Sequence, residues 1–102
     1  MSKIDINRHN LSELVEEGIQ IARARLLEIE CIPSLSVERR DLEVASKALE
    51  LIREELRLKM GRPIGQRSAG FTRYVIDEEP NLKMDPNLKD LIVQIERFYQ
   101  KY

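Results

Sequence analysis

Residues 37–60, VERRDLEVASKALELIREELRLKM, decide the fold class of this chain. Their apolar residues recur at spacings of three and four, which is the period of an amphipathic α-helix. One apolar line is an a/d-type seam made by Leu42, Ala45, Leu49, Ile52 and Leu56. A second line repeats every seven residues on a separate side of the helix, at Val37, Val44, Leu51 and Leu58. Because a surface helix needs only one apolar stripe, this helix is expected to contact two neighbours.

The first neighbour is a helix predicted over residues 10–31. Asn10 is a favourable N-cap residue, and Pro33 prevents the helix from continuing. Gly18 lies inside the apolar stripe of this helix, which indicates a close crossing with another helix. The short connection at residues 31–36 favours antiparallel packing of the two helices that it joins.

The second neighbour is a C-terminal helix predicted over residues 86–101. Asp85 is a suitable N-cap and Pro86 suits the first helical position. We expect this helix to return along the 37–60 helix and to cover Val44 and Leu51. If it leaves them exposed, the second apolar line becomes a surface for a homodimer or for another protein partner.

Residues 61–85 interrupt the helical pattern. The stretch GRPIGQRSAG, residues 61–70, holds three of the four glycines and is typical of a loop, and Gly61 is expected to end the helix before it. FTRYVI, residues 71–76, has the β-branched and aromatic composition of a strand. The predicted fold is therefore all-α or nearly so: a long antiparallel helical hairpin, a Gly/Arg-rich excursion with a short β-strand or hairpin, and a C-terminal amphipathic helix.

Length and composition agree with one small domain. The chain has 102 residues, of which 42% are apolar and 34% charged, and its formal net charge is −1. We predict a single helical domain over residues 1–102, with residues 1–9 as a flexible N-terminal arm. No apolar run is long enough for a membrane span, and the first residues lack the apolar stretch of a secretory signal. A cytoplasmic location is therefore expected, with no membrane partner.

Side chains for catalysis or metal binding are sparse. His9 is the single histidine and Cys31 the single cysteine, too few for a nitrogen/sulfur zinc site. The helix dipole near Cys31 opposes a thiolate, so we expect a small buried thiol there and a solvated imidazole at His9. The acidic run at residues 77–79 lacks the spacing of a calcium loop. We expect no catalytic residue, no cofactor and no metal, and hence no enzyme.

The Gly/Arg-rich excursion carries a local positive charge. Residues 61–76 contain three arginines and no acidic residue, and the aromatic rings near them offer stacking faces. Gly61-Arg62-Pro63 resembles the Gly-Arg-Pro core of AT-hook peptides, a resemblance that implies contact with the minor groove of DNA. The candidate binding residues lie within residues 59–74 and are Lys59, Arg62, Arg67, Phe71, Arg73 and Tyr74.

Two functions remain open at this point. The preferred one is a non-enzymatic protein-interaction module, such as an inhibitor, an immunity-type protein, an adaptor or an assembly factor. The alternative is a small nucleic-acid-binding protein that uses residues 59–74. Salt dependence separates them, because phosphate contacts weaken steeply as salt rises and apolar contacts do not.

Overall fold

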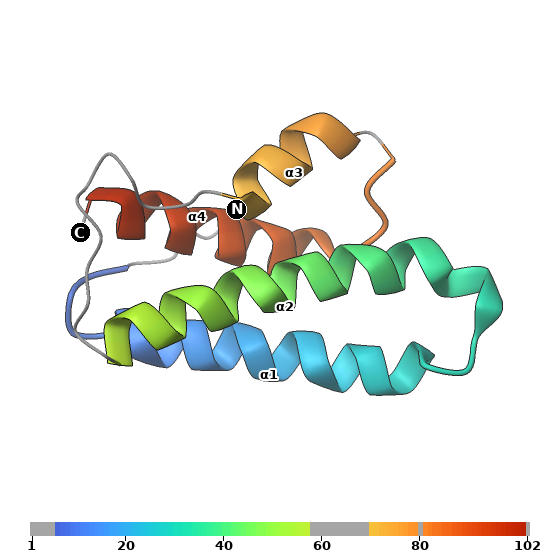
Figure 1. The fold of residues 1–102 in the computed structure, drawn as a ribbon, viewed down its shortest axis with the longest axis horizontal. Helices are drawn as coiled ribbons and strands as arrows, with labels where there is room; N and C mark the ends of the chain where they lie inside the picture. The colour runs from blue at the N-terminus through green and yellow to red at the C-terminus, as the bar shows by residue number, and fades with distance from the viewer. Residues whose placement is uncertain (1–5, 58–69, 80, 102) are drawn as a thin grey trace.

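The computed structural model describes residues 6–57, 70–79 and 81–101. In this part of the chain, all the regular secondary structure is helical. Helix α1 spans Leu11–Ile29, a 3-10 turn (η1) spans Pro33–Leu35, and α2 spans Ser36–Arg57. Helix α3 spans Gly70–Glu78 and α4 spans Pro86–Lys101 (Figure 1). The predicted all-α class is confirmed for the described residues.

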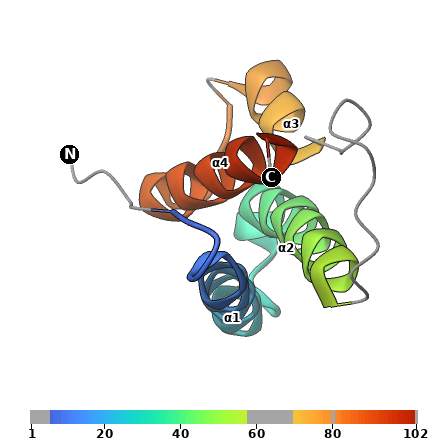
Figure 2. The ribbon, with the colours of Figure 1, turned by 90° about the vertical axis from the view of Figure 1, so that its left-hand side faces the viewer.

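Helices α1 and α2 lie side by side over most of their length and run in opposite directions, with η1 near the turn between them (Figure 1). Figure 2 shows α4 and α3 together on one side of this pair. Helix α4 packs on both α1 and α2, and the shorter α3 contacts α4 and α2. Within the described part of the chain, the opposite side of the α1–α2 pair carries no helix.

A single apolar core lies where these helices meet. Its completely buried large side chains come from all four helices, and they include Leu11, Ile19, Leu49, Phe71 and Ile92. The a/d-type seam of α2 faces this core, as the sequence predicts. Gly18 marks the predicted close crossing: a Cβ atom added there would lie 2.8 Å from Cδ1 of the buried Leu49.

The helix ends agree with the predictions at some points and differ at others. Asp85 caps α4, since its Oδ2 accepts a hydrogen bond of 3.2 Å from the Leu88 N–H. Asn10 occupies the N-cap position of α1 as predicted, but its side chain makes no capping hydrogen bond, and its Oδ1 accepts one from the Asn7 N–H. The first helix ends at Ile29, slightly before the predicted boundary. The predicted end of the second helix, residues 58–61, lies outside the described residues.

The strand predicted at residues 71–76 is wrong, because this segment belongs to α3. The composition of the segment favours a strand, but its apolar residues have a helical spacing. Phe71 and Val75 are one helical turn apart, and both are buried. Tertiary contacts decide the outcome: apolar side chains anchor α3 on the core, and a carboxylate from α4 binds its N-terminus. Such contacts regularly override β-propensity.

Candidate functional site

The aromatic residues predicted to stack on nucleic-acid bases contact other residues of the fold instead. Phe71 is completely buried, so its ring offers no face to a base. Tyr74 is half-buried, and its hydroxyl lies between Arg40 and Asp41. Arg73 is exposed on α3. The remaining predicted residues of this set, Lys59, Arg62 and Arg67, lie outside the described residues.

Glu96 on α4 binds the N-terminus of α3. Its carboxylate is 1% exposed and accepts three hydrogen bonds. The donors are the Phe71 N–H at 3.1 Å, the Thr72 N–H at 2.7 Å and the Thr72 hydroxyl at 2.8 Å. The first N–H groups of a helix have no partner inside the helix and carry partial positive charge, so a buried carboxylate is stabilised there. Glu96 is therefore a docking residue for α3.

Asp41 on α2 holds the middle of α3 and the segment after it. This completely buried carboxylate accepts a hydrogen bond of 2.5 Å from the Tyr74 hydroxyl and one of 2.8 Å from the Lys83 N–H. Burial, together with the hydrogen bond that it donates to Asp41, raises the pKa of Tyr74. The Tyr74 hydroxyl in turn accepts from Nε of Arg40, and this bond raises the pKa of Arg40. In the described part of the chain every buried side-chain nitrogen and oxygen has a partner, so the buried acids leave no unsatisfied polar atom in the fold.

The second apolar line of α2 is only partly covered. Val37 is 38% exposed and Leu51 is 42% exposed, whereas Val44 is half-buried against the core. The expectation that the C-terminal helix covers this line is therefore wrong at Leu51, because Leu51 borders an open groove between α2, α3 and α4. Leu58, the last residue of the line, lies outside the described residues.

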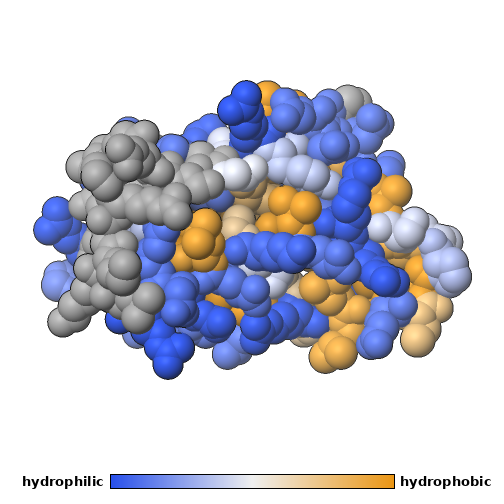
Figure 3. Space-filling model, in the orientation of Figure 1, coloured by the Kyte–Doolittle hydropathy of each residue, from blue (hydrophilic) through white to orange (hydrophobic). Residues whose placement is uncertain are grey.

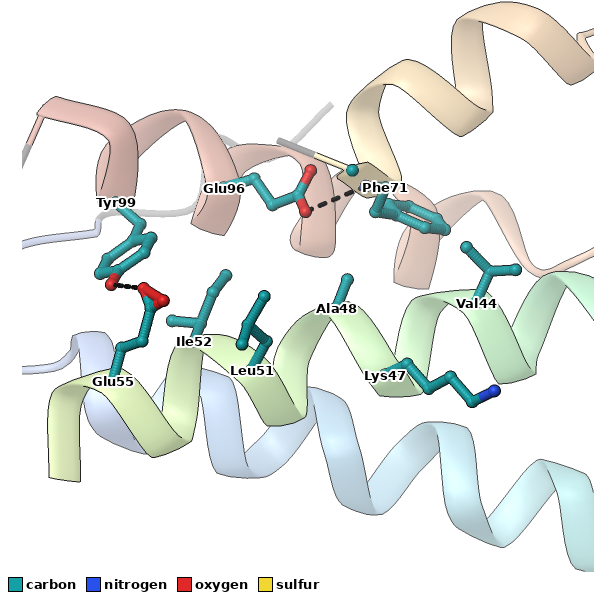
Figure 4. Close-up of a pocket in the computed structure, with 10 residues that line it drawn as sticks. Val44, Lys47, Ala48, Leu51, Ile52, Glu55, Phe71, Glu96 and Tyr99 are labelled. Carbon is teal, nitrogen blue, oxygen red and sulfur yellow. Dashed lines mark hydrogen bonds between the residues drawn. The ribbon is translucent and has the colours of Figure 1, made fainter. Parts of the chain in front are cut away.

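Val44 and Leu51 line one side of a groove of about 270 Å³ between α2, the start of α3 and α4. Figure 4 shows the α2 side chains on one side of this groove and Phe71 and Tyr99 on the other. The Tyr99 hydroxyl donates a hydrogen bond to Glu55, which joins α4 to α2 at one end of the groove. The groove is thus bordered by the Tyr99–Glu55 hydrogen bond and by the buried Glu96.

A larger groove of about 460 Å³ lies between α1 and α2, and we call it the hairpin groove. It is lined by Arg23, Leu26, Leu27 and Glu30 of α1 and by Arg39 and Glu43 of α2. Leu27 is 73% exposed, the highest value among the exposed large apolar side chains of the described residues. Figure 3 shows apolar surface near the turn between α1 and α2, where Ile32 and Val37 are also exposed.

The charged residues around the hairpin groove form an ion pair between the two helices and another within α2. A guanidinium nitrogen of Arg23 on α1 lies 2.5 Å from a carboxylate oxygen of Glu50 on α2. Arg39 pairs with Glu43 one turn along α2 at 3.5 Å and donates a hydrogen bond of 3.4 Å to the Glu30 carbonyl. These four side chains are between about one-third and one-half exposed, so they remain accessible to a partner.

No family model, no curated protein and no solved structure matches this chain.

Within the described residues, no group of three or more histidine, cysteine or acidic side chains has metal-binding geometry. His9 is exposed, as predicted, but Cys31 is exposed as well, so the prediction of a buried thiol is wrong. The reason is that α1 ends at Ile29 and leaves Cys31 in the connection. No helix in the described ranges is long and apolar enough to cross a membrane.

The hairpin groove was missed at the level of sequence, although a signal for it exists. Leu26 and Leu27 are adjacent, and neighbouring residues of a helix point about 100° apart. When Leu26 faces the core, Leu27 must lie off the apolar stripe. An apolar residue off the stripe, one turn from Arg23 and near Glu30, marks a surface rather than the core.

Proposed function

We propose that this chain is a non-enzymatic protein-interaction module that docks a partner protein in the hairpin groove. The observation that carries the proposal is the 73% exposure of Leu27 beside Leu26 in this groove. Burying an exposed leucine side chain in an interface contributes roughly 1.5–3 kcal/mol. Among the side chains that line the groove, Leu27 is therefore expected to contribute most to the binding free energy.

The rim of the groove suits a protein better than a polyanion. It carries two arginines and two glutamates, so it has no net charge to attract phosphate groups. A mixed, half-exposed polar rim around an apolar centre is the usual anatomy of a protein interface. A groove between two antiparallel helices also suits the apolar face of a partner helix.

Affinity capture with a matched pair of variants tests this function. Leu27→Asp places a charge in the groove and is expected to abolish capture of the native partner. The control is Ile76→Asp on α3, because Ile76 is 71% exposed and does not line the groove. Circular dichroism verifies that both variants are folded. Equal capture by Leu27→Asp and the parent chain would refute the proposal.

Salt distinguishes this function from nucleic-acid binding. Docking in a groove with an apolar centre is expected to survive a rise from 50 to 200 mM salt, whereas about six phosphate contacts would lose roughly a thousandfold in affinity. The nucleic-acid alternative and the cytoplasmic location both stay predictions from the sequence.

A further inference from the structure

At each end of the hairpin groove, the two helices carry charges of opposite sign. Along each helix, the sign of the charge changes from one end to the other. Because α1 and α2 run in opposite directions, Glu30 of α1 lies at the same end as Arg39 of α2, which donates to its carbonyl. At the other end, Arg23 of α1 lies beside α2 acids, where it pairs with Glu50. Glu43 of α2 also lines the groove and pairs with Arg39 one turn away.

Such an alternating pattern is complementary to itself. In a closed dimer with two-fold symmetry, the same patch lies on both sides of the interface. If the symmetry axis runs along the groove, Glu30 meets the second copy's Arg39. If the axis runs across the groove, Glu30 meets the second copy's Arg23. Either arrangement places opposite charges face to face.

The apolar centre is also suited to a second copy. Leu27 projects from α1 beside a groove of about 460 Å³ whose other apolar residue is Leu26. In a two-fold arrangement each Leu27 enters the groove of the other copy, as a knob enters a hole. Antiparallel helices then face antiparallel helices, which is the packing of a four-helix bundle.

We propose that the hairpin groove binds a second copy of this chain, so that the protein forms a symmetric homodimer through α1 and α2. This inference rests on the proposed function, because it names the partner of the same groove. It identifies the charge pattern as the element that selects the partner and sets its orientation, which is the usual role of charges at an interface.

Analytical ultracentrifugation over a range of protein concentrations tests the inference. The parent chain is expected to change from monomer to dimer as concentration rises, and Leu27→Asp to remain monomeric. Glu30→Arg places like charges face to face in both arrangements, so it is expected to weaken the dimer by about tenfold or more. The control is Glu17→Arg, which changes the same charge at an exposed α1 position outside the groove. It is expected to dimerise like the parent.

Two double variants test the facing charges directly. Glu30→Arg with Arg39→Glu restores dimerisation if the axis runs along the groove, and Glu30→Arg with Arg23→Glu restores it if the axis runs across. Restoration by one of the two supports the inference, and restoration by neither overturns it. A dimer that tolerates both Leu27→Asp and Glu30→Arg also overturns it, because that dimer uses another surface.

Ultracentrifugation and affinity capture together separate this inference from the proposed function. If the chain stays monomeric at every concentration but Leu27→Asp abolishes capture of a different protein, the homodimer is refuted and the docking function stands. If the chain is monomeric and Leu27→Asp captures the same proteins as the parent, both proposals fail.

Discussion

Replacement of Glu96 by glutamine measures how strongly α4 holds α3. A hydrogen bond to a charged group contributes about 1.5–3 kcal/mol and a neutral one about 1 kcal/mol. Glutamine keeps one carbonyl oxygen, which retains the two bonds from Thr72 in weaker form, and it turns an NH₂ group toward the Phe71 N–H. Relief from burying a charge offsets part of this loss. The expected net cost is about 2–3 kcal/mol of unfolding free energy.

Urea denaturation followed by circular dichroism gives this free energy, and Glu17→Gln on the exposed side of α1 is the control. Amide hydrogen exchange locates the effect. A helix of nine residues is unstable alone, so protection near Phe71 and Val75 is expected to fall further than protection in α1. A loss no larger than that of Glu17→Gln, with α3 protection unchanged, would refute the docking role of Glu96.

Three further predictions concern the core and the Tyr74 hydroxyl. Leu49→Ala and Ile52→Ala are each expected to cost about 2–5 kcal/mol in urea denaturation, because both side chains are almost completely buried. Gly18→Ala gains about 1 kcal/mol of helix propensity but forces a Cβ against Leu49, at a cost of about 1–3 kcal/mol. A net loss of about 1 kcal/mol is therefore expected, and a stabilised variant would contradict the close crossing. The raised pKa of Tyr74 means that its contribution to stability is fully present below the ordinary value of about 10 and is lost as the pH rises through the higher folded value. Absorbance or NMR titration of the phenol checks this, and Asp41→Asn is expected to lower the midpoint.

The sequence alone predicted correctly the helices in which the apolar spacing and the end signals agree. Asp85 and Pro86 predicted the start of α4 correctly, and the seam around Leu49 and Ile52 predicted the buried face of α2. These features are local, so the information lies within a few turns of one helix. Gly18 is similar, because a glycine within an apolar stripe has few roles other than a close approach.

The parts that could not be predicted depend on residues distant in sequence. The segment at residues 71–76 is helical because Glu96, on another helix, binds its N-terminus, and no pattern within the segment reveals that contact. The exposure of Leu51 depends on the path of α4, which the pattern of α2 does not determine. The hairpin groove requires knowing which residues of α1 and α2 meet across their interface.

The most direct test of the hairpin groove as a docking surface is an NMR titration of the isotope-labelled chain with increasing unlabelled chain. Shift changes are expected to concentrate at the residues that line the groove: Arg23, Leu26, Leu27, Glu30, Arg39 and Glu43. The same titration with labelled Leu27→Asp is expected to show no change. Shift changes centred on α3 and α4, or equal changes in parent and variant, would contradict the account.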